Sequence, residues 1–181
     1  MDEFALTIRL ARPQDAAEVA RVYISSWQDT YPSVIPHAFL CAMTVKGQTQ
    51  RWENTIKRRA PDLVIVAESP KHGIVGMASL GPARDRGIGF DGEVYTLYVD
   101  PDFYGRGVGR ALLQGAFTAM RERQFRSCVI WAHARNNARF FYEAMGGKLI
   151  AERVVHLMGE NMPEAGFGWR DLAPALKSTA R

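Results

Sequence analysis

The segment from residue 93 to residue 113 limits the possible folds strongly, because a strand-like stretch, a glycine-rich turn and a helix-like stretch follow one another directly. EVYTLYV, at residues 93–99, is rich in β-branched and aromatic residues, and Asp100-Pro101 stops it. From Val108 onward, apolar or small residues recur at the spacing of one helix face, and most are Ala or Gly. We therefore expect a strand, a turn and a helix that lies close against a sheet.

The string YGRGVGRALL, at residues 104–113, is suited to bind an anion. Backbone N–H groups at the start of a helix have no partner within it, and the helix dipole attracts negative charge. Glycine lets an anionic oxygen come within hydrogen-bonding distance of the backbone. Arg106 and Arg110 could add charge-assisted contacts or could remain solvated. The string lacks Gly-Lys-Ser/Thr, which disfavours nucleotide hydrolysis.

A second glycine-rich run, GIGFDG at residues 87–92, spells the dinucleotide pattern G-x-G-x-x-G. In a dinucleotide site the first glycine ends a buried strand and the last glycine opens a helix. Here the strand-like residues 93–99 follow instead. We therefore interpret GIGFDG as a loop between two strands.

Periodicity and turn residues predict the other elements. Strands are expected at residues 7–11, 63–68, 73–81, 93–99, 127–134, 148–158 and 166–172, the first at a sheet edge. Helices are expected at residues 13–27, 48–59 and 138–145 and from Val108 onward. In this order, antiparallel strands in the first half of the chain are followed by a β-α-β-α unit. The order predicts an α+β (mixed α/β) fold with a single domain over residues 1–181.

Composition narrows the function class. The chain has 181 residues, 47% of them hydrophobic, which is enough for one sizeable core. Its cysteines, Cys41 and Cys128, form no C-x-x-C pair, and its four histidines are dispersed, so we expect no metal site. The net charge of +4 is spread over scattered basic residues, which favours a polyanionic small cofactor over nucleic acid.

The sequence also indicates a location. MDEFALTIRL lacks the layout of a secretory signal, and no apolar run approaches the length of a membrane span. We expect a cytoplasmic protein that does not bind a membrane.

Two motifs in this order resemble the GNAT superfamily of acetyl-CoA-dependent N-acetyltransferases. They are LYVDPDFYGRGVGRALL at residues 97–113 and NNARFFYEAMGG at residues 136–147. The resemblance implies a mostly antiparallel central sheet with a splayed parallel strand pair, helices on both faces, and acetyl-CoA as cofactor. The strings at residues 26–40 and 166–172 resemble a bacterial branch whose acceptors are mostly unassigned.

The resemblance also implies cofactor contacts. Backbone amides of the turn would hold the pyrophosphate of coenzyme A, a role carried over to Tyr104, Gly105, Arg106, Gly107, Val108, Gly109 and Arg110. The family has Arg or Gln where this chain has Tyr104, and Arg106 could substitute for that side chain. The main chain of a bulged strand would pair with pantetheine, a role carried over to Leu97, Tyr98 and Val99.

Further roles follow for the thioester and pantetheine. The amide near Leu97 would stabilise the charge on the thioester oxygen. Either Asn136 or Asn137 would hydrogen-bond to pantetheine. For Leu97 itself, core packing fits the same position.

Acetyl transfer needs a neutral amine, a base and an acid. Glu93 stands where the histone-acetylating branch keeps its glutamate base; alternatively, it is a strand-end carboxylate that faces solvent. Tyr142 matches the family's general acid, with Phe141 and Met145 facing the core; alternatively, Tyr142 is buried for packing. Trp27, Tyr31 and Tyr95 are expected to line the acceptor side.

The expected function is transfer of the acetyl group of acetyl-CoA to a primary amine of a small molecule or peptide, by direct attack in a ternary complex. The alternative is a catalytically silent sensor that binds acyl-CoA. The last strand pair, with Trp169 in an apolar neighbourhood, could form a homodimer edge. One sequence does not identify the amine, because loop side chains build acceptor pockets.

Overall fold

The computed structural model describes residues 5–31, 35, 37–58, 60–157 and 159–173. The chain divides into two compact units. Unit 1 comprises residues 1–79 and 96–116, and unit 2 comprises residues 80–95 and 117–181. We describe each unit by itself.

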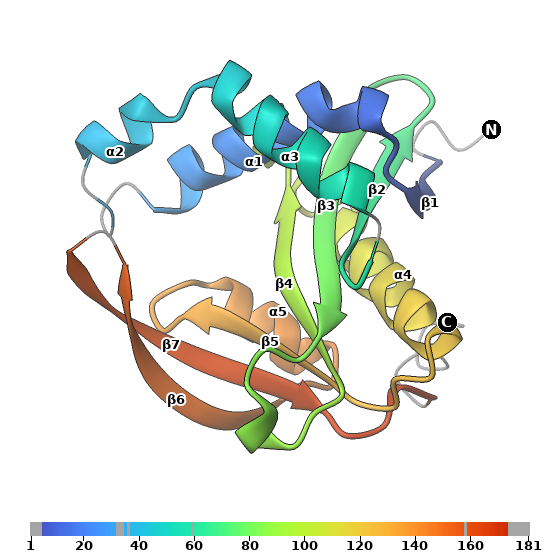
Figure 1. The fold of residues 1–181 in the computed structure, drawn as a ribbon, viewed down its shortest axis with the longest axis vertical. Helices are drawn as coiled ribbons and strands as arrows, with labels where there is room; N and C mark the ends of the chain where they lie inside the picture. Colours follow the sequence, from blue (N-terminus) through green and yellow to red (C-terminus); the bar gives the residue numbers. More distant parts are fainter. Residues whose placement is uncertain (1–4, 32–34, 36, 59, 158, 174–181) are drawn as a thin grey trace. The chain divides into compact units, whose positions relative to one another are not determined.

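The helices and strands follow one another as the sequence predicts, with one additional helix (Figure 1). The strands are β1 (Thr7–Leu10), β2 (Leu63–Ser69), β3 (Gly73–Pro82), β4 (Gly92–Val99), β5 (Cys128–His133), β6 (Lys148–Leu157) and β7 (Glu160–Trp169). The helices are α1 (Ala16–Thr30), α2 (His37–Ala42), α3 (Val45–Arg58), α4 (Val108–Glu122) and α5 (Ala138–Ala144).

The seven strands form one sheet in the order β1-β2-β3-β4-β5-β7-β6. β1 with β2, β5 with β7 and β6 with β7 are antiparallel, whereas β4 with β5 is parallel. The parallel ladder joins Gly92–Val94 to Cys128–Ile130, which is a short part of β4. The expected α+β fold with a mostly antiparallel sheet and one parallel pair is confirmed, as is the edge position of β1.

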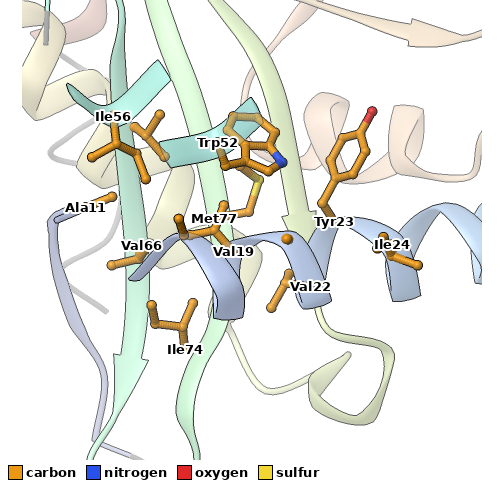
Figure 2. Packing of buried hydrophobic residues seen from close by; sticks show 13 residues of the cluster. Ala11, Val19, Val22, Tyr23, Ile24, Trp52, Ile56, Val66, Ile74 and Met77 are labelled. Carbon is orange, nitrogen blue, oxygen red and sulfur yellow. The ribbon is translucent and has the colours of Figure 1, made fainter. Parts of the chain in front are cut away.

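In unit 1, α1 and α3 pack on one face of β2 and β3 (Figure 2). α1 buries Val19, Val22 and Tyr23 at helical spacing. Their partners include Val66 of β2 and Trp52 of α3. These apolar contacts fix the helix that carries the predicted acceptor-side aromatic residues.

The first half of α4 packs on the opposite face of the unit 1 strands. A Cβ atom at Gly76 of β3 would lie 2.8 Å from Cδ1 of Leu112 and 2.9 Å from Cγ1 of Val108. A Cβ atom at Gly115 would overlap Ile8 and lie 3.5 Å from Cδ1 of Ile65. The small residues therefore let helix and sheet approach closely, as the Ala/Gly stripe predicts.

In unit 2, α5 and the end of α4 cover aromatic residues of β7. The rings of Phe117 and Trp169 are 5.0 Å apart, and Trp169 Nε1 donates to the carbonyl of Met145 at 2.9 Å. After α5, Gly146 has φ of 83°, which gives the expected left-handed turn.

One helix and several boundaries differ from the sequence-based expectation; α1, for example, continues to Thr30 and does not end at Trp27. α2 was not predicted, and α3 begins at Val45 rather than at residue 48. β7 begins at Glu160 and not at residue 166, although Pro163 lies within it. The carbonyl of Pro163 accepts from Ala134 on the β5 side, so its missing N–H also faces that side. The ladder with β5 starts one residue later, and the proline therefore removes no ladder bond.

No helix among the described residues is long and apolar enough to cross a membrane. Within the same residues, no group of three His, Cys, Asp or Glu side chains is arranged to hold a metal ion.

Candidate active site

The glycine-rich turn of unit 1 presents backbone to solvent. Gly105 and Gly107 have φ of 73° and 80°, and no atom lies within 4 Å of a Cβ added at either one. Backbone conformation, and not crowding, therefore demands glycine here. Ala111 donates to the carbonyl of Gly107 at 3.0 Å and closes the first turn of α4. The earlier N–H groups, of Val108 and Gly109, have no acceptor among the described residues, so they could bind an anion.

Hydrogen bonds fix the chain just before this turn. The backbone N–H of Asp100 donates to Val75 at 2.9 Å, and its side chain accepts from the N–H of Asp102 at 3.2 Å. Tyr104 N–H donates to the carbonyl of Pro101 at 3.2 Å. β4 is thereby joined to the turn by a defined one-turn 3-10 helix, Pro101–Phe103.

The side chains of the turn do not all face the glycines. The Arg106 guanidinium lies over the Phe103 ring, 5.4 Å from its centroid. Arg110 is exposed at the surface of α4. Tyr104 is half exposed. Its pKa is raised above the ordinary value because it is partly buried, although a hydrogen bond with Thr30 of α1 acts in the opposite direction. Tyr104, at the position of the family's Arg or Gln, therefore lies near the end of α1.

The end of β4 is held by α1. The hydroxyl of Ser26, which is almost fully buried, donates to the carbonyl of Val99 at 2.7 Å. The Tyr98 ring lies 5.4 Å from that of Tyr23 in an edge contact. Burial raises the pKa of Tyr98 well above its ordinary value. The Val99 carbonyl thus already accepts one hydrogen bond. The predicted pairing of Leu97, Tyr98 and Val99 with pantetheine stays a prediction.

Unit 1 brings two of the three predicted acceptor-side residues together. The Trp27 and Tyr31 rings are 5.0 Å apart, and Trp27 lies 6.5 Å from Tyr98. The segment after Tyr31 continues into residues 32–34 and 36, which lie outside the described residues. Tyr95, the third candidate, belongs to unit 2.

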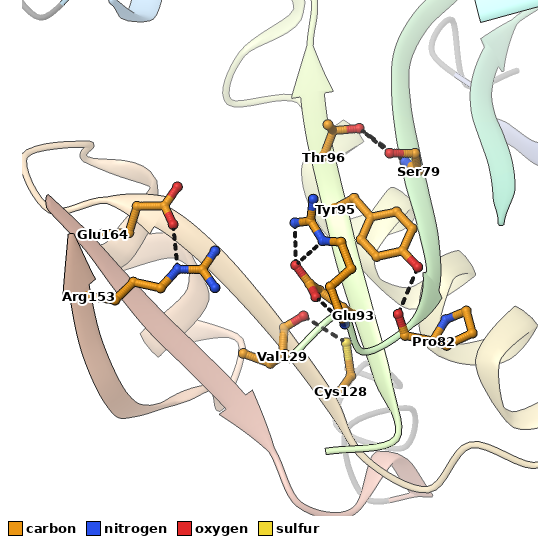
Figure 3. Close-up of polar contacts among 10 residues, drawn as sticks. Ser79, Pro82, Glu93, Tyr95, Thr96, Cys128, Val129, Arg153 and Glu164 are labelled. Atoms are coloured by element: carbon orange, nitrogen blue, oxygen red, sulfur yellow. Dashed lines mark hydrogen bonds and ion pairs between the residues drawn. The ribbon is translucent and has the colours of Figure 1, made fainter. Parts of the chain in front are cut away.

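Glu93 in unit 2 is 1% exposed, so the alternative that it faces solvent is wrong. Its carboxylate accepts from the backbone N–H of Arg84 at 2.9 Å and from Nε of Arg84 at 3.0 Å, and Nη2 of Arg84 contacts it as well (Figure 3). Hydrogen bonding with Glu93 raises the pKa of Arg84. The Arg84 guanidinium lies 4.7 Å from the centroid of Tyr95, whose hydroxyl donates to Pro82 at 2.7 Å.

Sequence reasoning missed Arg84. It lies nine residues before Glu93, in the loop between β3 and β4. The only available signal was the basic string ARDR next to GIGFDG. Its pairing depends on how the loop folds back toward β4, which spacing along the chain does not encode.

Tyr142 is the most buried residue of α5, at 4% exposure. Its ring lies 5.8 Å from Phe167 and 6.5 Å from Trp169. The expectation that Phe141 and Met145 face the core in its place is wrong, because both are only partly buried. These contacts fit the alternative that Tyr142 is buried for packing, and its role as an acid stays a prediction.

Asn136 is used for local structure. Its Oδ1 accepts from the backbone N–H of Ala138 at 2.9 Å, at the start of α5. Asn137 is exposed. The choice between the two as the pantetheine contact stays open.

β5 and its neighbours add charged residues that sequence reasoning did not select. His133 is 6% exposed, its Nδ1 accepts from the N–H of Arg135 at 3.2 Å, and burial lowers its pKa. Arg153 lies 3.8 Å from the Trp131 ring centroid and donates to Glu164 at 2.8 Å (Figure 3). His133 pairs with Glu164 across β5 and β7.

Comparisons with known proteins agree with this arrangement. Residues 19–147 match the model of the acetyltransferase (GNAT) family. The chain is 34% identical over 173 residues to the uncharacterized N-acetyltransferase YuaI of Bacillus subtilis (strain 168), covering 96% of this chain and 97% of that protein. It is 30% identical to the L-amino acid N-acyltransferase MnaT of Escherichia coli (strain K12), covering 92% and 90%. The structure of yncA from Salmonella typhimurium with its cofactor acetyl-CoA has a TM-score of 0.69 at 22% identity, covering 93% and 94%.

Proposed function

The chain belongs to the GNAT acetyltransferase family, and on that premise we propose that it moves the acetyl group of acetyl-CoA to a primary amine of a small molecule or peptide. The observation that carries the proposal is the exposed turn at Gly105 and Gly107, followed by N–H groups at the start of α4 that have no acceptor among the described residues. Residues 1–181 act as one acetyltransferase domain.

Unit 1 supplies the cofactor contacts. Turn amides between Gly105 and Arg110 bind the pyrophosphate, because N–H groups at a helix start attract negative charge, whereas the N–H of Tyr104 already donates to the carbonyl of Pro101. The main chain of Leu97, Tyr98 and Val99 pairs with pantetheine. Asn136 or Asn137 hydrogen-bonds to pantetheine.

Unit 2 supplies the proton transfers. The lone pair of the neutral amine attacks the thioester carbonyl carbon, and Glu93 takes a proton from the amine, directly or through water. The C–S bond then breaks, and Tyr142 gives a proton to the departing thiolate. The products are the N-acetyl amine and coenzyme A.

The contacts of Glu93 support this role in part. An amine with an ordinary pKa of about 10 is protonated at neutral pH, so a base has to take a proton before the nitrogen can attack. Arg84 holds the carboxylate in one orientation through three donors. Positioning of a base contributes to rate because the reacting atoms meet already aligned.

A small-molecule acceptor is favoured over a peptide. The relative MnaT is described as an L-amino acid N-acyltransferase, and the match covers 90% of it. Trp27 and Tyr31 offer aromatic surface on the acceptor side.

Release of free thiol, measured with acetyl-CoA and a panel of amino acids, polyamines and short peptides, tests the proposal. We expect release that depends on one class of amine, and mass spectrometry should show a gain of one acetyl group. The Gly107→Val variant should lose cofactor binding, because φ of 80° strains a β-branched residue. Tight acetyl-CoA binding without turnover on any amine would instead support the acyl-CoA sensor.

A further inference from the structure

Arg21 of α1 makes polar contacts with both strands that meet before the cofactor turn. Its Nη1 pairs with Oδ2 of Asp100, and its Nη2 donates to the carbonyl of Ile74 at 2.8 Å. Asp100 is the residue that follows β4, and Ile74 lies at the start of β3. All three residues belong to unit 1.

Asp100 creates an electrostatic problem for an anionic cofactor. Its side chain is only 8% exposed, so water screens its charge poorly. It lies five residues before Gly105, where the turn begins to offer its amides. An unpaired carboxylate at this place would repel a pyrophosphate on the turn.

The carboxylate of Asp100 also has a structural role. Oδ1 of Asp100 accepts from the N–H of Asp102 and thereby fixes the 3-10 turn that leads to Tyr104. The carboxylate therefore stabilises the turn as a hydrogen-bond acceptor, while its negative charge opposes the binding of an anion. Arg21 neutralises the charge through the other oxygen, Oδ2, and leaves the cap intact.

We propose that Arg21 is a positioning residue for the cofactor, which neutralises the charge of Asp100 five residues before Gly105. The inference rests on the proposed function, since it requires a cofactor with negative charge at the turn. Arg21 itself touches neither the reacting atoms nor the turn amides; it acts through Asp100.

Binding of coenzyme A, measured by calorimetry for wild type and five variants, tests this inference. Arg21→Gln should weaken coenzyme A binding by about tenfold, which corresponds to about 1.4 kcal/mol. Asp100→Asn should bind at least as tightly as wild type, because an asparagine oxygen still caps the turn. The double variant Arg21→Gln/Asp100→Asn should regain binding to within about threefold of Asp100→Asn, since no charge is left to neutralise. The loss in Arg21→Gln should shrink at high salt.

Arg9→Gln is the matched control. Arg9 pairs with Asp15 and Glu68 in the same unit, and it lies on β1, which β2 and β3 separate from β4 in the sheet. This variant should lose stability but keep coenzyme A affinity. Arg21→Lys, which keeps the charge, should bind better than Arg21→Gln and remains informative if Arg21→Gln folds poorly.

The outcomes separate the two proposals. A wild-type protein that does not bind coenzyme A would refute the proposed function. Wild-type binding with an unchanged Arg21→Gln variant, or with a double variant as weak as Arg21→Gln, would refute the role of Arg21 alone. Rescue by Asp100→Asn is a result that a purely structural role of Arg21 does not give.

Discussion

Gly76 of β3 allows a sharp test of how closely α4 packs on the unit 1 strands. In the Gly76→Ala variant, the new methyl group would lie 2.8 Å from Cδ1 of Leu112, 2.9 Å from Cγ1 of Val108 and 3.2 Å from the carbonyl of Tyr98. Replacing Gly by Ala in a strand gains about 0.5–1 kcal/mol, because the unfolded chain is less free. Overpacking a closed core costs about 1–3 kcal/mol. Since three groups are in the way, we expect overpacking to prevail and the variant to lose about 1 kcal/mol.

Urea unfolding followed by circular dichroism measures this loss, and the melting temperature should fall by about 2–4 °C. Because Val108 begins α4, its displacement should also weaken coenzyme A binding, which calorimetry can detect. Gly47→Ala, at an exposed position of α3 with only the Thr44 side chain nearby, is the control and should be neutral or stabilising. In the double variant Gly76→Ala/Leu112→Ala, the cost of the two changes should be less than additive. A Gly76→Ala variant as stable as wild type would show that the packing argument is wrong.

Three further outcomes are expected. Glu93→Gln should lower kcat/KM by about 100-fold, because a glutamine side chain cannot take the proton; turnover equal to wild type would exclude Glu93 as the base. Tyr142→Phe should lower kcat by about 100-fold while the dissociation constant of coenzyme A stays the same, and equal turnover would assign the acid to another group. A hydrogen bond from Arg9 lowers the pKa of Asp15 below its ordinary value of 3.8. Its stabilisation is therefore present above about pH 4 and lost as pH falls below it, so the difference in unfolding free energy between wild type and Asp15→Asn should shrink in acid.

The sequence predicts the strand, turn and helix around residues 93–113 well, because each signal there is local. The Ala/Gly stripe of α4 reflects its close approach to the sheet, and Gly105 and Gly107 mark backbone that other residues adopt with strain. Local signals do not predict α2 or the start of β7 at Glu160. In β7 the proline and polar residues read as a loop, while the pairing with β6 and β5 decides the strand.

In the candidate site, too, local sequence signals are predictable and contacts between distant segments are not. Single residues such as Glu93 and Tyr142 can be selected from motifs, but their surroundings cannot. The burial of Glu93 depends on Arg84, which a folded loop supplies. In α5, which has seven residues, the periodicity is too short to tell which aromatic residue points inward. Contacts with β7 then decide that it is Tyr142.

The hydrogen bond from Ser26 to Val99 has a consequence for redesign of the enzyme. Ser26 and Trp27 are neighbours on α1; Ser26 is hydrogen-bonded to the strand that leads to the proposed cofactor turn, and Trp27 is one of the aromatic residues predicted on the acceptor side. A library that varies α1 to obtain new amine selectivity would therefore also vary cofactor affinity. Selection at saturating acetyl-CoA would hide that trade-off, and selection at scarce acetyl-CoA would discard many variants with useful selectivity.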